Sequence, residues 1–185
     1  MKQSVMNEYL KQHKTVITLN AETLEAYDQH HAKFHPKRKN RSLSWLGKTR
    51  TGLLPMLNNF LNVATSLQRN QRKDAVQDYI KYTMQQQGVK QDMISKCAVV
   101  VKQYNPTQRK FDLDGVSVKS AFDAMTEHHF WQDDNYDIVH PLIFVGGCDK
   151  NNPRSEICVY EITEEYPEDF VFEVIKNELY ENKLK

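Results

Sequence analysis

Lys110–Val139, which reads KFDLDGVSVKSAFDAMTEHHFWQDDNYDIV, carries the features from which fold and function are inferred. It holds two acidic clusters, Asp112 with Asp114 and Asp133 with Asp134, joined by helix-compatible residues. Carboxylates brought close together repel and raise one another's pKa unless a cation lies between them. Mg²⁺ and Mn²⁺ take carboxylate and water oxygens and leave positions free for a phosphate. The stretch therefore predicts a divalent-metal site, with Mg²⁺ as the first choice and Mn²⁺ as the second.

A structural interpretation of the same residues is also open. Acidic residues are favoured at the N-terminus of a helix, so Asp112 and Asp114 can be capping residues of the helix that follows them. The residues 133–135 can likewise form a turn. This alternative leaves unexplained why two acidic clusters lie at the two ends of one segment.

The composition is that of an ordinary globular domain on the polar side. Hydrophobic residues make up 39% of the 185 positions, enough for one domain with a core and an appendage. No apolar run is long enough for a membrane span, and the N-terminus lacks the apolar segment of a secretory signal. The three cysteines form no CxxC pair, which argues against a zinc site and a disulfide framework. A cytoplasmic location is expected, with Cys97 and Cys158 as buried thiols.

Positive charge is concentrated in one part of a chain whose net charge is only +1. No acidic residue lies between Asp28 and Asp74, whereas residues 161–185 carry eight acids against three lysines. An uncompensated basic interval is typical of a polyanion partner, usually nucleic acid, although a solvated loop is the simpler alternative. The residues that we expect to contact DNA are Lys37, Arg38, Lys39, Arg41, Lys48, Arg50, Arg69, Arg72 and Lys73.

Apolar periodicity predicts an α+β fold, a small mixed β-sheet of about four strands flanked by helices. Strands are expected at 15–19, 93–103, 138–145 and 156–162, the third at a sheet edge or bulged because Pro141 cannot donate a hydrogen bond. Helices are expected at 1–13, 21–34, 57–87 with a possible break near 69–73, 115–128, and from Pro167 onward.

The FDLDG letters at 111–115 also match the Asp-x-Asp-Gly motif of haloacid dehalogenase phosphatases. That motif requires an apolar strand running directly into it, but the preceding residues YNPTQRK are polar and contain proline. The interval between Asp114 and Asp133 is also too short for a βαβ crossover. We therefore do not favour this interpretation.

The ordered set of motifs resembles the RusA-like Holliday-junction resolvases, small endonucleases common in prophages. The resemblance lies in KFDLD at 110–114, Lys119, DAM at 123–125, FWQDD at 130–134 and, upstream, PMLNN at 55–59. It covers roughly residues 52–163. The chain departs from the family pattern at Gly115, where the family has Asn, and in one extra residue before Lys119.

The resemblance implies roles for individual residues. Asp112, Asp114 and Asp134 would be the catalytic carboxylates that bind Mg²⁺, with Asp133 as a further ligand or a supporting neighbour. Lys119 would neutralise charge on the scissile phosphate or position water. These roles fit the chemistry, because a metal ion screens the phosphodiester, activates water and stabilises the leaving alkoxide.

The resemblance further implies a homodimer that resolves four-way junctions in branched DNA during recombination or repair. The expected organisation is an N-terminal strand, helix and basic arm (1–51), an endonuclease core (52–165) and an acidic C-terminal helix (166–185). Two alternatives remain open. A relative of the same fold can bind junctions without cutting them, which the departures at Gly115 and before Lys119 would explain, and the acidic helix can be an interaction module.

Overall fold

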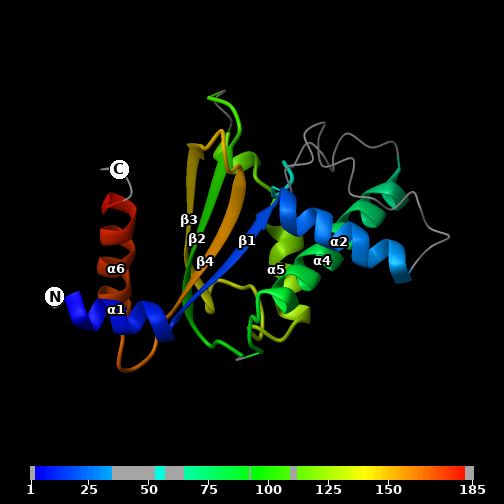
Figure 1. Cartoon of the computed structure of the whole chain (residues 1–185). Coiled ribbons are helices and arrows are strands. Elements are labelled where there is room, and N and C mark those ends of the chain that lie inside the picture. The colour runs from blue at the N-terminus through cyan, green and yellow to red at the C-terminus, as the bar shows by residue number, and fades with distance from the viewer. Residues whose placement is uncertain (1–2, 35–52, 57–64, 92, 109–111, 182–185) are drawn as a thin grey trace.

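Four strands form a single mixed sheet in the order β1-β4-β2-β3 in the computed structural model of the chain (Figure 1). β4 is antiparallel to both β1 and β2, whereas β3 is parallel to β2. The bounds are β1 (Lys14–Asn20), β2 (Cys97–Asn105), β3 (Val139–Cys148) and β4 (Arg154–Glu161). The structure describes residues 3–34, 53–56, 65–91, 93–108 and 112–181, with the side chains of 114 and 181 left aside.

Alternating side chains of the central strands separate two apolar clusters, one on each face of the sheet. In β2, Val99 and Val101 belong to the first cluster, whereas Ala98 and Val100 belong to the second. All four are at most 1% exposed, which explains why this strand is apolar without interruption rather than alternating with polar residues. Burial of each valine contributes roughly 1.5–3 kcal/mol before the entropy of ordering the chain is subtracted.

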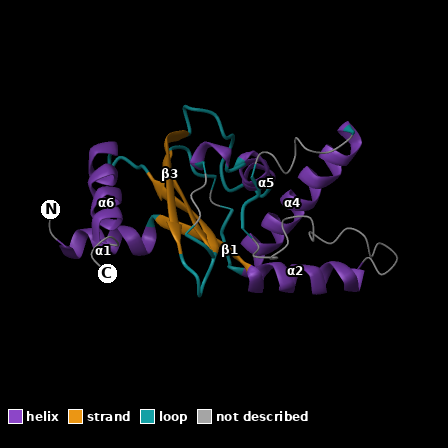
Figure 2. Ribbon diagram, turned by 90° about the horizontal axis from the view of Figure 1, so that it is seen from above, coloured by secondary structure: helices purple, strands orange, loops and turns teal. Residues whose placement is uncertain are grey.

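Helices cover both faces, so the molecule has three layers (Figures 1 and 2). The first face is covered by α2 (Ala21–Phe34), α4 (Ser66–Gln86) and α5 (Lys119–Glu127), and the second by α1 (Gln3–Gln12) and α6 (Glu168–Glu181). A short 3₁₀ turn, η3 (Leu113–Gly115), precedes α5. The site discussed below lies on the first face.

The predicted fold class and most predicted elements are confirmed. The helix expected at 21–34 has these bounds in the structure, and the four strands occur where expected, with shifts at their ends. β3 is an edge strand and contains Pro141, as predicted, after a cis peptide bond. Cys97 and Cys158 are buried thiols.

The helix expected through 69–73 is confirmed, and the break that was possible there does not occur, because α4 is continuous from Ser66 to Gln86. Residues 69–71 are exposed, and the run consists largely of good helix formers, so it needs no apolar residues there. One expectation about helices is wrong. The expected helix at 115–128 is shorter, because α5 begins only at Lys119 and the residues before it form η3. The expected helical residues 57–64 lie outside the described part of the chain.

Both ends of the described chain pack on the sheet. β1 pairs with β4 along its whole length. Lys14 at the start of β1 donates hydrogen bonds to the carboxylate of Glu178 in α6, at 2.6 and 2.9 Å. Among the described residues, every helix is too short or too polar to cross a membrane.

Candidate metal and phosphate site at the N-terminal end of helix α5

The Asp133–Asp134 pair is held in place by a buried aromatic anchor that precedes it. Trp131 is fully buried, and its indole Nε1 donates a hydrogen bond to Thr126 Oγ1 of α5 at 2.8 Å. Its ring meets the ring of Phe122 edge-on at 5.2 Å between centroids. Because the residues after α5 are fixed against that helix, the acidic pair has a defined position relative to it.

The acidic pair directly precedes a turn at residues 136–138, so the turn predicted at 133–135 lies slightly later in the chain. One oxygen of Asp133 accepts from the backbone N–H of Asp134 at 2.8 Å, and the other accepts from Asn135 Nδ2 at 3.0 Å. Asn135 Oδ1 accepts in turn from the N–H of Asp137 at 3.0 Å. Asp133 therefore has a supporting role just before the turn, although each carboxylate oxygen keeps a second lone pair. Asp134 is half-buried beside it.

The first acidic cluster belongs to η3, just before α5. Asp112 occupies the N-cap position of η3, yet its exposed side chain makes no capping hydrogen bond. The N-cap of α5 is Val118, which offers no side-chain cap either. The capping role that we considered for Asp112 is therefore not observed. Asp114 lies within η3, and its side chain is outside the described part of the structure.

Gly115 closes η3 beneath a methionine. A Cβ atom at this position would lie 2.8 Å from the terminal methyl carbon of Met56. Met56 forms an isolated β-bridge with Val116, and the N–H of Ser117 donates to the carbonyl of Pro55 at 2.8 Å. The glycine thus allows the segment at residues 53–56 to pack closely on the turn. Because the end of a methionine side chain is flexible, another residue at 115 would displace it at modest cost.

Lys119, the predicted catalytic lysine, is paired one turn along α5. Its Nζ donates to Asp123 Oδ1 at 3.0 Å. The other oxygen of Asp123 is buried and lies 2.8 Å from Lys73 Nζ of α4. This second contact has the distance of a hydrogen bond but not the angle, so we treat it as an ion pair. One carboxylate thus links two ammonium groups from two helices.

The pKa shifts in this cluster follow from its charges. A hydrogen bond from Lys119 to Asp123, followed by the charge of that carboxylate, raises the pKa of Lys119, and the charges of Asp134 and Asp133 raise it further. Burial alone would raise the pKa of Asp123, but its close contacts with Lys73 and Lys119 and their positive charges outweigh burial and lower it. The second acidic pair therefore lies within electrostatic reach of the first turn of α5.

The short turn η3 and Lys119 lie at the N-terminal end of α5, and the charges of Asp133 and Asp134 act on Lys119. Described carboxylates outnumber the two ammonium groups, and oxygen is the donor that Mg²⁺ prefers. Among the described side chains, no three His, Cys, Asp or Glu residues come close enough to hold a metal ion together. Mg²⁺ commonly uses one or two carboxylates, with water and substrate phosphate completing its shell. Mg²⁺ binding by Asp112, Asp114, Asp133 and Asp134 therefore stays a prediction from the sequence.

Three of the predicted DNA-contacting residues lie on α4. Arg69 is exposed, and Arg72 and Lys73 are half-buried. Their spacing of three and four residues places them near one another on the helix surface. The other six, at positions 37–50, lie outside the described residues.

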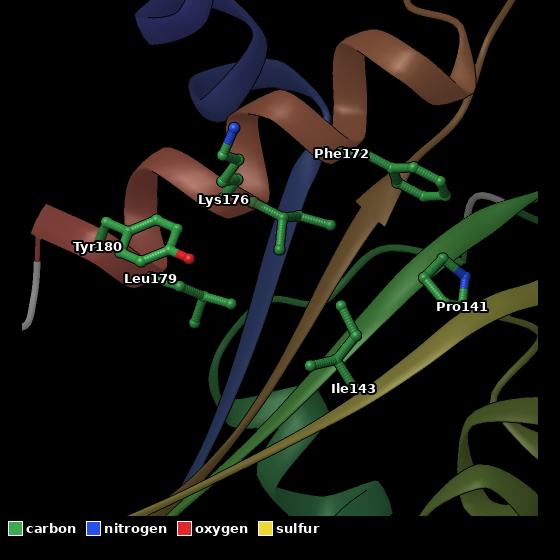
Figure 3. Close-up of a pocket in the computed structure, with 7 residues that line it drawn as sticks. Pro141, Ile143, Phe172, Lys176, Leu179 and Tyr180 are labelled. Carbon is green, nitrogen blue, oxygen red and sulfur yellow. The ribbon is translucent and has the colours of Figure 1, made fainter.

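A separate apolar groove of about 370 Å³ lies on the opposite face of the sheet, between β3 and α6 (Figure 3). The residues lining it are Pro141, Ile143, Phe172, Ile175, Lys176, Leu179 and Tyr180. Five of these are apolar, and the groove includes no carboxylate. It therefore has none of the chemistry of the acidic clusters.

Sequence reasoning did not identify the partnership between Lys73 and Asp123. The pairing of Lys119 with Asp123 has a local signal, because residues four apart meet on a helix. Lys73 carries no such signal, since its contact with Asp123 arises only when α4 packs against α5.

The Asp123 cluster predicts a pH dependence of stability. The folded-state pKa of Asp123 lies below its ordinary value of 3.8. Its contribution to folding is therefore fully present above that value and is lost as the pH falls through the folded-state pKa. We expect Asp123→Asn to lower the free energy of unfolding by about 1–2 kcal/mol at pH 7. Urea unfolding between pH 7 and pH 2.5 measures this difference.

A matched control exists in the same pair of helices. Lys81 of α4 pairs with Glu127 of α5 at 2.8 Å, but this carboxylate is 53% exposed. We expect Glu127→Gln to change stability by less than about 0.5 kcal/mol, because exposed ion pairs are weak. A loss in Asp123→Asn that grows rather than shrinks toward pH 2.5 would contradict the assigned pKa shift.

Comparison with known proteins adds no relative. The chain matches no model of a protein family, and a search of curated proteins finds no significant match.

Proposed function

We propose that this protein is a Mg²⁺-dependent endodeoxyribonuclease that selects branched DNA, with the four-way junction as its principal substrate. The observation that carries the proposal is the placement of Lys119 beside Asp123 and within electrostatic reach of Asp133 and Asp134. The resemblance of this segment to the RusA-like resolvases supplies the substrate class. The basic residues on α4 supply a surface for the DNA backbone.

The residues of the chain would divide the work of phosphodiester hydrolysis. Asp134, Asp112 and Asp114 would hold Mg²⁺, which when bound screens the phosphate and lowers the pKa of a water ligand. Lys119 keeps its proton at neutral pH, because the neighbouring carboxylates raise its pKa. It therefore acts as a fixed positive charge toward a phosphate oxygen rather than as a base. Asp133 would hold the segment that positions Asp134.

The hydrolysis of the phosphodiester needs only water as a second reactant. A water oxygen forms a bond to phosphorus, and the bond from phosphorus to one ester oxygen breaks. The products are a phosphate monoester and a hydroxyl group on the two DNA ends. Neither an oxidant nor a further substrate is required.

A labelled four-way junction, with linear duplex as control, tests the proposal in Mg²⁺, Mn²⁺ and EDTA. We expect paired, symmetric nicks in the junction only, in either metal and not in EDTA. Symmetric cutting also requires two active sites, so size-exclusion chromatography should show a homodimer. Equal cutting of linear duplex, or cutting in EDTA, would contradict the proposal.

The second candidate is a junction-binding protein without cleavage. Two observations favour it: glycine replaces the family's asparagine at position 115, and both oxygens of Asp133 are engaged by Asp134 and Asn135. This candidate predicts junction binding that salt weakens, with no nicks in either metal. The same experiment separates the two candidates.

A further inference from the structure

Asp123 lies between two lysines that belong to different helices. Its Oδ1 accepts from Lys119 Nζ at 3.0 Å, and its Oδ2 lies 2.8 Å from Lys73 Nζ. The side chain of Asp123 is only 18% exposed, whereas those of Lys73 and Lys119 are 42% and 73% exposed. The carboxylate side chain is thus largely enclosed, whereas the two lysine side chains are more exposed.

Charge in this group of three residues is not balanced. Two ammonium groups share one carboxylate, and each has three N–H donors. Asp123 accepts a hydrogen bond from Lys119, and its contact with Lys73 is an ion pair. Like charges held close together are unfavourable unless an anion compensates them. The charges of Asp134 and Asp133 also act on Lys119, whereas Asp123 is the carboxylate that pairs with Lys73 among the described residues. Lys73 keeps N–H donors that this carboxylate does not take.

Packing of α4 on α5 does not by itself require this arrangement. The pair Lys81–Glu127 already joins the same two helices with one lysine and one carboxylate at 2.8 Å. At Asp123 the contact with Lys73 joins the two helices, whereas Lys119 pairs with Asp123 within α5. Lys119 is therefore not required for the contact between the helices.

The anion that best fits is a DNA backbone phosphate. It has one negative charge and two non-bridging oxygens, which match the surplus charge and the two exposed donors. Arg69 and Arg72 continue the positive surface along α4 from Lys73. A polyanion following this helix would reach Lys73 before it reaches Lys119.

We infer that Lys73 is a second phosphate-binding lysine of the site, and that Asp123 is a positioning residue that holds Lys73 and Lys119 for one phosphate group. This inference rests on the proposed function for its substrate. Its test uses DNA binding without metal, so that it can fail or succeed separately from cleavage.

The test measures binding of the labelled four-way junction in EDTA across a series of NaCl concentrations. We expect Lys73→Gln to reduce the slope of log K against log salt by about one, because one phosphate contact is lost. Lys73→Arg, which keeps the charge, should retain most of the slope. The matched control Lys81→Gln should have the wild-type slope, although it removes a lysine from the same helix.

Asp123→Asn separates positioning from charge. Removal of a negative charge would by itself strengthen binding to a polyanion. If Asp123 positions the two lysines, the variant should instead bind the junction several-fold more weakly. Circular dichroism and urea unfolding establish that each variant is folded. Lys73→Ala is a second variant that removes the charge of Lys73.

Several outcomes would overturn the inference. The first is a wild-type salt slope for both Lys73→Gln and Lys73→Ala, and the second is an equal loss of slope in Lys81→Gln. The others are tighter junction binding by Asp123→Asn and no junction binding by the wild type in EDTA. Binding that changes as expected, combined with no cleavage in Mg²⁺ or Mn²⁺, would contradict the proposed nuclease and leave the phosphate site supported.

Discussion

Replacing Asp134 with asparagine is expected to reduce Mg²⁺-dependent cleavage of a four-way junction by about 10³-fold. The loss of a carboxylate ligand weakens metal binding and the electrostatic stabilisation that the metal supplies, worth several kcal/mol. Asparagine has nearly the same shape, so the turn that follows the residue should persist. The rate of nicking under single-turnover conditions, with Mg²⁺ in excess, is the measurement.

Asp137→Asn is the matched control for this experiment. Asp137 is exposed, lies in that turn and makes its hydrogen bond through its backbone N–H rather than its side chain. Its variant should cut at the wild-type rate. Cleavage by Asp134→Asn within about threefold of the wild type would remove Asp134 from the mechanism. Unchanged junction binding in EDTA would show that the loss concerns chemistry rather than affinity.

Trp131→Ala is expected to be the most destabilising single change near the site, with a loss of about 3–5 kcal/mol in the free energy of unfolding. The side chain is fully buried and packs edge-on against Phe122 and Phe130. Truncation leaves a large cavity and leaves Thr126 without its indole donor. Urea unfolding at neutral pH measures the loss. A decrease of less than about 1 kcal/mol would contradict the anchoring role.

A second pair of variants separates the ring from its hydrogen bond. Trp131→Phe keeps much of the apolar volume, so its loss should be smaller than that of the alanine variant. Thr126→Val keeps the indole in place but leaves its N–H buried without an acceptor, at a cost of about 1–3 kcal/mol. Both variants should also slow cleavage if Trp131 fixes the position of Asp134. If Thr126→Val is stable but does not cleave the junction, this hydrogen bond matters more for the position of Asp134 than for the stability of the protein.

Local patterns were sufficient for much of the fold. The run at 97–101 is apolar at every position, which indicates a strand buried on both faces, and β2 is one of the two interior strands of the sheet. Pro141 restricts its strand to an edge, because proline lacks the N–H that a second neighbour would require. Each of these features depends on a residue and its near neighbours in sequence.

Helix ends were less predictable. The segment QRNQRK shows no apolar periodicity, so it suggested a break, yet α4 runs through it. Helix propensity there is good, and residues 66–71 at the start of α4 are exposed. The residues before Lys119 are compatible with a helix, but η3 forms instead and packs against the segment at 53–56. That contact is distant in sequence and has no local signal.

The sequence by itself determined the α+β class, a buried interior strand, and the residue types that a metal and phosphate site requires. Only the tertiary structure decided how those residues meet. Packing of α4 on α5 brings Lys73 to the buried oxygen of Asp123. The anchor at Trp131 returns the chain to α5, so that Asp133 and Asp134 act electrostatically on Lys119. The physical reason is that charge interactions depend on distance in space, which periodicity along the chain does not encode.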